Sequence, residues 1–291
     1  MMEQKRYNPV SRRDEEIREE KFTGERPLYR GKDLKIYDCI FFDGESPLKE
    51  SSDIELFGCE FQWKYPIWYS KNIKLKNSSF QETARSGIWY TEDMEVSECL
   101  LGAPKTFRRC KNLIVKNSSM LNAQETLWMC DGVELSNVSA RGDYFGMNSQ
   151  NIKVDHLELL GNYAFDGAKN VEVRNSRLLS KDCFWNCENV TVYDSYIIGE
   201  YLGWNTKNLT FVNCTIESDQ GLCYIQDLTM KNCKLINTNL AFEYSENIDA
   251  DIISDVDSVL NPGSGEIRTK KIEELIIEPD NCDINRTKIR G

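Results

Sequence analysis

Tryptophan and tyrosine recur along this chain at a spacing that could build a ligand-binding surface. Several tryptophans stand about 19–20 residues apart, or at multiples of that interval, and tyrosines precede several of them by about three positions. If equivalent positions stack, one stripe collects Trp89, Trp128, Trp185, Trp204, Tyr144, Tyr163 and Tyr201. Aromatic rings cover the apolar faces of sugar rings, so the stripe predicts a saccharide-binding surface.

Charged residues interrupt this stripe near its middle. Asp166 and Asp182 would fall on adjacent turns, with carboxylates on the order of 6–10 Å apart, which suits an inverting glycoside hydrolase. One carboxyl would protonate the leaving group and the other would activate water. Asp143 could raise the pKa of either, and Arg108 could bind the carboxylate of an acidic sugar. These four residues are the candidate catalytic set; the alternative is that the acids are solvated side chains of an acidic protein.

A repeat of about 19–20 residues must position these side chains. It recurs as NIKLKNSSF, NLIVKNSSM and NVEVRNSRL, with Asn72, Asn112 and Asn170 as first residues. Apolar and polar residues alternate within each copy, which is the period of a β-strand. Polar corners separate three short strands in each copy. Copies stacked at about 4.8 Å would bring like residues over like, as in a parallel β-helix.

The repeat therefore predicts an all-β fold, a single right-handed parallel β-helix of about twelve turns. We expect the coil to span residues 24–254. The charged residues 1–23, including the short helical candidate SRRDEEIREE, would form an N-terminal cap. Residues 255–291 would form a C-terminal capping segment of the same domain. Both ends need covers, because open sheet edges invite aggregation.

Charge and hydropathy restrict the partners of the chain. Its 291 residues carry a formal net charge of −11, which argues against nucleic acid and anionic membranes as partners. No apolar run approaches the roughly 18 residues of a membrane span. The first residues lack the apolar core of a signal peptide, so a cytoplasmic location is expected.

The cysteines and the single histidine predict neither a metal site nor a cofactor. Most of the 11 cysteines fall at inward positions of the repeat, where they act as small buried apolar residues. Cys183 and Cys187 lie four apart, but no second pair or histidine completes a metal-binding set. His156 stands where other copies have Asn or Asp, away from the stripe, which favours a structural role over a catalytic one.

The recurring NhxhxNSxh units, with h an apolar residue, resemble the pectin-lyase-like superfamily of right-handed parallel β-helices. More narrowly, the chain resembles an uncharacterised bacterial family with that fold, a domain of unknown function, over roughly residues 24–277. The superfamily implies lyases, hydrolases and esterases that act on acidic sugars. The Gly-His-Gly and Asn-Thr-Asp motifs of polygalacturonases are absent here, and the calcium-binding aspartate cluster of pectate lyases is not evident. Catalytic residues therefore do not transfer, and a shared fold does not transfer activity.

Two functions stay open on the sequence. In the first, the chain binds or modifies carbohydrate through the aromatic and acidic stripe. In the second, it is a non-catalytic rod that uses the same stripe to form a homo-oligomer or to bind another protein, since interfaces also favour Trp and Tyr.

Overall fold

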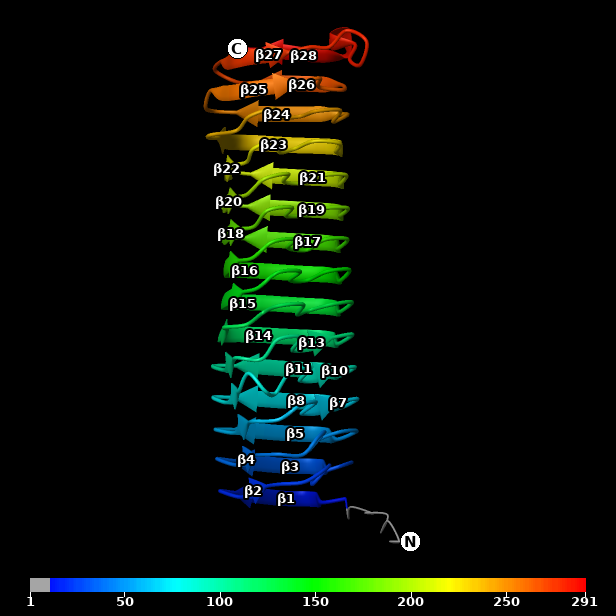
Figure 1. Ribbon diagram of the computed structural model, residues 1–291, viewed down its shortest axis with the longest axis vertical. Coiled ribbons are helices and arrows are strands. Elements are labelled where there is room, and N and C mark those ends of the chain that lie inside the picture. Colours follow the sequence, from blue (N-terminus) through cyan, green and yellow to red (C-terminus); the bar gives the residue numbers. More distant parts are fainter. Residues whose placement is uncertain (1–10) are drawn as a thin grey trace.

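The computed structural model is a straight β-solenoid of about fifteen turns, and it describes residues 11–291 (Figure 1). Each turn adds one parallel strand to the sheet of the turn before it, so the strands stack as rungs of a ladder. At about 4.8 Å per rung the rod is roughly 70 Å long. β1 lies at one end of the rod and β28 at the other. The predicted all-β solenoid class is confirmed.

The longest strands form one broad face of the rod. They are β1 (Arg13–Arg18), β3 (Lys32–Tyr37), β5 (Ser52–Phe57), β8 (Lys71–Lys76), β11 (Glu92–Ser97), β14 (Lys111–Met120), β15 (Asp131–Arg141), β16 (Gln150–Leu160), β17 (Lys169–Arg174), β19 (Glu188–Tyr193), β21 (Lys207–Val212), β23 (Gln226–Leu235), β24 (Ile248–Ile252), β26 (Gly265–Arg268) and β28 (Thr287–Arg290).

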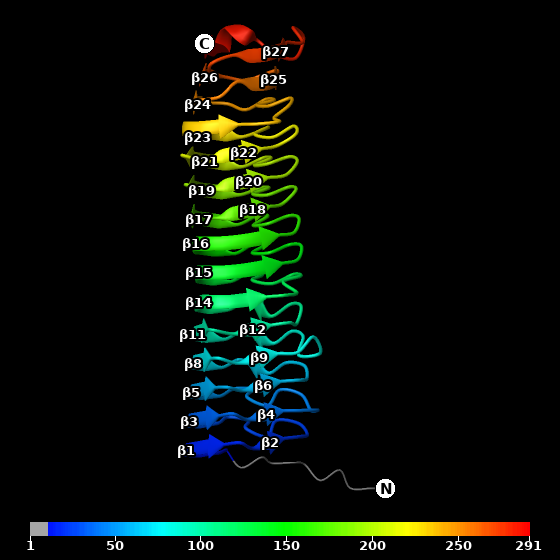
Figure 2. The same ribbon diagram turned by 90° about the vertical axis from the view of Figure 1, so that its left-hand side faces the viewer.

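Beyond a corner, short strands form a second face, visible in Figure 2. They are β2 (Lys21–Phe22), β4 (Ile40–Phe41), β6 (Glu60–Phe61), β9 (Ser79–Phe80), β12 (Leu100–Leu101), β18 (Arg177–Leu179), β20 (Tyr196–Ile198) and β22 (Thr215–Glu217), continued by the ends of β14, β15, β16 and β23. A third face carries β7 (Ile67–Trp68), β10 (Ile88–Trp89) and β13 (Phe107–Arg108). β25 (Val256–Leu260) pairs separately with β27 (Ile272–Ile276).

The alternation of the sequence explains the strands and the core. In β17, Val171 and Val173 are buried, whereas Asn170 is exposed. Like residues meet inside the coil: the ring centroids of Phe22 and Phe41 are 4.9 Å apart, and those of Phe41 and Phe61 are 4.7 Å apart. A column of stacked rings fills the interior at the pitch of the backbone.

Asparagines fix the corners. Asn170, Asn189 and Asn208 all have φ between 54° and 58°, the left-handed region that Asn adopts more readily than most residues. Their amides form a ladder, in which Nδ2 of Asn189 donates to Oδ1 of Asn170 at 3.1 Å and Nδ2 of Asn208 donates to Oδ1 of Asn189 at 2.9 Å. Along these three turns each corner amide is hydrogen-bonded to the next, which holds the turns in register.

The coil extends further in both directions than the sequence predicted. About fifteen turns replace the predicted twelve. Within the predicted N-terminal cap, residues 1–10 lie outside the described residues, and Arg13–Arg18 form β1 instead of a short helix. Within residues 255–291, β26 and β28 continue the broad face, and a single 3₁₀ turn, η1 (Ile284–Arg286), is the only helix in the part of the chain that the structure describes. The repeat is hard to recognise in these turns, because β1 is densely charged and the spacing is irregular after Asn247.

Residues 11–291 contain no helix with the length and hydrophobicity to cross a lipid bilayer.

Candidate functional site

Strand register brings the predicted aromatic stripe together on the third face. β10 pairs with β7 and β13, so Trp89 lies between Trp68 and Arg108, and a further bridge places Arg108 beside Trp128. Backbone hydrogen bonds between successive turns continue this order of stacked positions toward the C-terminus. We call this the tryptophan column: Trp68, Trp89, Arg108, Trp128, Met147, Asp166, Trp185 and Trp204. Beside it runs the tyrosine column: Tyr65, Ser86, Lys105, Glu125, Tyr144, Tyr163, Asp182 and Tyr201.

Residues 11–291 leave the stripe half-buried along the rod. Trp128, Trp185 and Trp204 are each partly exposed. The C-terminal strands β26 and β28 extend the coil at its end and do not fold back over the tryptophan column (Figure 2). The stripe is therefore not covered by the chain's own C-terminal segment.

In the N-terminal half of the tryptophan column the indole rings and one guanidinium stack on one another. The rings of Trp68 and Trp89 stack at 5.0 Å with planes 7° apart. The guanidinium of Arg108 lies between two indoles, 4.6 Å from the ring centroid of Trp89 and 4.5 Å from that of Trp128. Rings stacked along the rod axis turn their edges outward, so their faces are not available to a sugar.

Arg108 is held from a second direction. Its Nη2 lies 3.4 Å from Oε2 of Glu125, which also pairs with Nζ of Lys105 at 3.0 Å. The Arg108 side chain is 19% exposed, and its Nε is buried without a hydrogen-bond partner in the structure. The two indoles and the ion pair with Glu125 hold Arg108 in the tryptophan column. The predicted binding of a sugar carboxylate by Arg108 stays a prediction.

The indole nitrogens bind the backbone. Nε1 of Trp89 donates to the carbonyl oxygen of Lys105 at 2.9 Å, and Nε1 of Trp185 donates to that of Tyr201 at 3.1 Å. Trp68 and Trp128 donate to the carbonyl oxygens of Ser86 and Tyr144 in the same way. Each bond reaches the next turn, so the indoles are oriented by the coil and are rigid.

The tryptophan column breaks for two turns at Met147 and Asp166. Perpendicular contacts replace stacking at both sides of this break: the Trp128 and Tyr144 ring planes lie at 84°, and those of Tyr163 and Trp185 lie at 83°. Trp128 and Trp185 therefore face the break without a parallel aromatic neighbour on that side. The two indoles are about 14 Å apart along the rod axis, three rungs of about 4.8 Å.

Asp182 is the unusual acid of this region. It is buried, with 7% of its surface exposed, and it lies on the turn of Trp185 next to Tyr163. Burial raises the pKa of the Asp182 carboxyl, and the negative charges of Glu200 and Asp166 act in the same direction. Lys181 and a hydrogen bond from the Tyr163 hydroxyl oppose that increase in the pKa. Lys181 is itself paired with Glu200 at 2.7 Å.

The other two predicted acids lie in different surroundings. Asp166 is half-buried on the turn below Asp182, and its Oδ1 accepts a hydrogen bond from Nδ2 of Asn186 at 3.1 Å. The structure thus brings Asp166 and Asp182 onto adjacent turns. Asp143 lies two turns below Asp182, and its Oδ1 accepts the backbone N–H of Asn162 at 2.8 Å. Asp143 therefore supports the coil at its corner.

One stacked aromatic pair was not predicted from the sequence. Tyr69 and Tyr90 stack at 4.6 Å with planes 3° apart, next to Trp68 and Trp89. The Lys49 ammonium lies 5.7 Å from the ring centroid of Tyr69, and the Arg109 guanidinium carbon lies 5.9 Å from that of Tyr90. The signal was present, because each tyrosine directly follows its tryptophan in the sequence.

Across residues 11–291 no cluster of His, Cys, Asp or Glu has the geometry of a metal site. All eleven cysteines are free thiols, and ten of them are buried. The inward cysteine positions predicted from the repeat are therefore confirmed.

Solved structures with a similar fold share little sequence with this chain. PfbA, a surface adhesin of Streptococcus pneumoniae, has 10% identity and a TM-score of 0.47, covering 79% of this chain and 85% of its own. The tailspike protein of Escherichia coli bacteriophage HK620, as a double mutant, has 8% identity and a TM-score of 0.43, covering 91% and 66%. The A-module of the mannuronan C-5 epimerase AlgE4 of Azotobacter vinelandii has 9% identity and a TM-score of 0.28, covering 95% and 88%.

Comparison with curated proteins finds no match. A family model does match, over residues 15–290, which is nearly the whole solenoid. The chain therefore belongs to the family DUF3737, described as a protein of unknown function.

Proposed function

We propose that this protein binds a saccharide at the break in the tryptophan column and modifies it with Asp182 and Asp166. The observation that supports this proposal most strongly is the coincidence of two features. The column loses its stacked rings at Met147 and Asp166, and the buried Asp182 lies on the adjacent turn. Indoles that lack a stacked ring on one side, next to an acid with a raised pKa, are the features from which we infer a carbohydrate-active site.

Asp182 is suited to the role of general acid. Its raised pKa keeps a larger fraction of the carboxyl protonated than an exposed Asp would have at the same pH. Asp166 remains hydrogen-bonded to Asn186, which orients its carboxylate. In the proposed reaction Asp182 protonates the leaving oxygen as the glycosidic bond breaks, and Asp166 accepts a proton from the attacking water.

The decisive experiment is a glycan array with three tryptophan variants. Trp128→Ala and Trp185→Ala remove the two indoles next to the break, whereas Trp89→Ala removes an indole that lies between the Trp68 ring and the Arg108 guanidinium. We expect the first two variants to lose glycan binding and Trp89→Ala to retain it. Binding by Trp185→Ala equal to that of the wild type, or no glycan binding by the wild type, would refute the proposal.

A second candidate function is a non-catalytic scaffold that associates through the stripe. The observation in its favour is that Trp68, Trp89, Trp128 and Trp185 all donate their indole N–H groups to the protein's own backbone. Stacked and internally bonded rings are what a purely structural column needs. Sedimentation of the wild type and of Trp204→Ala tests it: concentration-dependent association that the variant loses would support the scaffold.

A further inference from the structure

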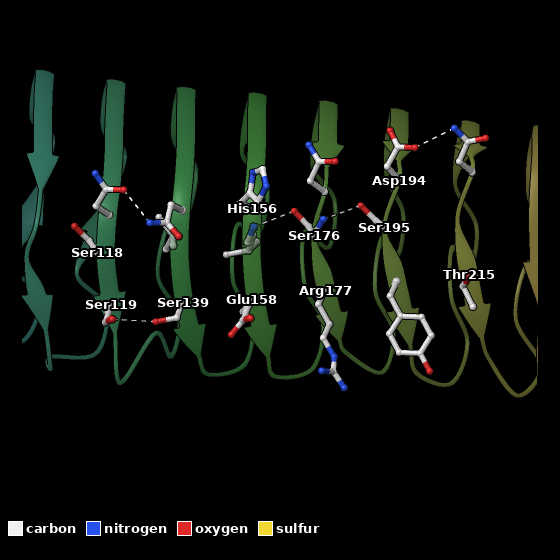
Figure 3. A pocket seen from close by; sticks show the side chains of 17 residues that line it. Ser118, Ser119, Ser139, His156, Glu158, Ser176, Arg177, Asp194, Ser195 and Thr215 are labelled. Atoms are coloured by element: carbon white, nitrogen blue, oxygen red, sulfur yellow. Dashed lines mark hydrogen bonds between the residues drawn. The ribbon is translucent and has the colours of Figure 1, made fainter.

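A polar groove lies along the corner between the broad face and the second face, away from the aromatic stripe. Its volume is about 950 Å³, and six turns contribute to it, from that of Asn117 to that of Asn213. At about 4.8 Å per turn the groove is roughly 25–29 Å long. Figure 3 shows His156 in the row along one wall and Glu158 and Arg177 in the row along the other.

One wall of the groove, the corner wall, is a ladder of Asn and Asp side chains that one residue of another type interrupts. Nδ2 of Asn137 donates to Oδ1 of Asn117 at 2.9 Å, and Nδ2 of Asn213 donates to Oδ1 of Asp194 at 2.9 Å. Each ladder amide uses one of its two N–H donors in this way and keeps the other for a ligand. Among the corner residues of the groove, His156 alone is neither Asn nor Asp.

His156 interrupts the ladder. Nδ2 of Asn175 donates to Oδ1 of Asp155 and not to the residue stacked below it. The imidazole side chain is 63% exposed, and its Nδ1 lies 3.0 Å from Oδ1 of Asp155. That contact orients the imidazole ring, and the second ring nitrogen, Nε2, remains for a hydrogen bond to a ligand.

The facing wall carries two charged residues, one on the turn of His156 and one on the next turn. Ser119 and Ser139 stack with their hydroxyls hydrogen-bonded at 3.0 Å, and the next two positions of that row are Glu158 and Arg177. These two charges are neighbours in the register of β16 and β18, yet no ion pair joins them among residues 11–291. By contrast, Lys169 and Glu188, neighbours in the register of β17 and β19, pair at 2.9 Å. Glu158 and Arg177 are both exposed, and the guanidinium carbon of Arg177 lies 5.8 Å from the ring centroid of Tyr196, its neighbour along this wall.

The backbone donors in the floor of the groove are already used. The backbone N–H of Leu157 donates to Oγ of Ser176 at 3.0 Å, and that of Ser176 donates to Oγ of Ser195 at 3.0 Å. The groove therefore presents a ligand with side-chain amides, hydroxyls and charges, groups that hydrogen-bond the hydroxyl groups of a sugar chain.

We propose that this groove is a second saccharide site, in which an extended oligosaccharide is bound by the amides of the corner wall and by His156, Glu158 and Arg177. His156 interrupts the Asn/Asp ladder of the groove, and charged side chains stand on the facing wall on the same turn and the next. In a solenoid whose stability rests on stacking like on like, a residue that interrupts a ladder beside exposed charges indicates a function there. The site is independent of the break in the tryptophan column, since it lies on other strands.

The test is a glycan array and a titration of the bound oligosaccharide with His156→Asn and Arg177→Gln. His156→Asn restores the amide ladder, so the variant should unfold at a temperature equal to or above that of the wild type. Both variants should bind the groove ligand about tenfold more weakly, because each removes one hydrogen bond to a charged or polar group. Lys153→Gln, on the open broad face, is the matched control and should bind normally.

The outcomes separate this site from the stripe. An oligosaccharide whose binding is weakened by His156→Asn and Arg177→Gln but not by Trp185→Ala supports the groove as a site separate from the break, while glycans whose binding Trp185→Ala weakens report the break. Glycan binding that Trp185→Ala weakens and that neither groove variant changes for any glycan overturns the groove and supports the break. Wild-type affinity in both groove variants, or binding of extended peptides in the groove in place of glycans, also overturns the proposal.

Discussion

The two halves of the aromatic stripe have the same strand register and similar residues, but they differ in what their rings contact. In the N-terminal half, Trp68 stacks on Trp89, and Arg108 fills the space between Trp89 and Trp128. In the C-terminal half, Trp185 meets Tyr163 at 83° and Trp204 at 38°. We call the first half closed, because its indoles stack on each other or on Arg108, and the second half open, because its indoles have only perpendicular or tilted ring neighbours. The open half also holds Asp166 and Asp182.

This difference follows from the pitch of the coil. Successive turns are about 4.8 Å apart, close to the separation of stacked aromatic rings. An unbroken column of aromatics therefore covers its own faces, as Tyr144 and Tyr163 also do at 4.8 Å. Only where the column is interrupted, as at Met147 and Asp166, can a ring face meet a ligand. In a β-helix, binding capacity is gained by breaking an aromatic ladder.

Among the acids near the break, Asp182 should be the one whose substitution lowers turnover most. If the protein hydrolyses a saccharide, Asp182→Asn should lower turnover by about 10²–10⁴-fold, the usual contribution of a general acid. Asp143→Asn is the matched control, because that carboxylate holds the backbone N–H of Asn162. It should retain turnover within a few-fold. Hydrolysis assays on both variants check this, and an equal loss in the two would contradict the assignment.

The closed half should contribute more to stability than the open half. Trp89→Ala loses a stacked indole at 5.0 Å and a cation–π contact, whereas Trp185→Ala loses one perpendicular and one tilted ring contact, at 5.9 Å and 6.3 Å. We expect Trp89→Ala to lower the free energy of unfolding by about 1–2 kcal/mol more than Trp185→Ala. Urea denaturation measures both values. Equal losses would mean that ring orientation does not separate the two halves.

The guanidinium of Arg108 should contribute to the stability of the closed half. Arg108→Met removes two ring contacts and the ion pair with Glu125, and should lower the free energy of unfolding by about 1–2 kcal/mol. Arg109→Met changes the next residue, which lies 5.9 Å from one ring, and should have a smaller effect. Thermal unfolding of the two variants gives the comparison, and a neutral Arg108→Met would remove Arg108 from the structural column.

The smallest expected effect is a pH dependence of stability at Asp182. Its pKa is raised in the folded state, so the folded protein holds this proton more tightly than the unfolded chain does. Stability from this group is therefore present at low pH and falls as the pH rises through the folded pKa. Relative to the wild type, Asp182→Asn should gain stability over that window. Unfolding temperatures from about pH 3 to about pH 8 check the sign, and parallel curves would contradict it.

The repeat predicted the solenoid, the stacking of like residues and both columns of the stripe, because a period of two and a period of about 19–20 residues determine strand faces and register. Ring orientation was beyond the sequence. Whether Trp89 lies flat on Trp68 or perpendicular to a tyrosine depends on rotamers that neighbouring turns select. The guanidinium of Arg108 between two indoles has the same origin.

The groove and the ends of the coil were missed for another reason. Asn117, Ser119 and Ser139 resemble ordinary repeat residues, and the concave corner that gathers them exists only in three dimensions. His156 was expected to be structural, although it is the residue that interrupts the corner ladder. Near the termini, charge on β1 and changed spacing before β26 obscured a periodicity that the backbone keeps.

Oxidative footprinting of the tryptophans, with and without a saturating saccharide from the array, reports which indoles a ligand covers. Mass spectrometry reports the oxidation of each indole separately in the same sample. We expect protection of Trp128 and Trp185, which lie next to the break, and unchanged oxidation of Trp89, which lies between Trp68 and Arg108. Protection of Trp89 with no change at Trp128 and Trp185 would contradict a saccharide site at the break.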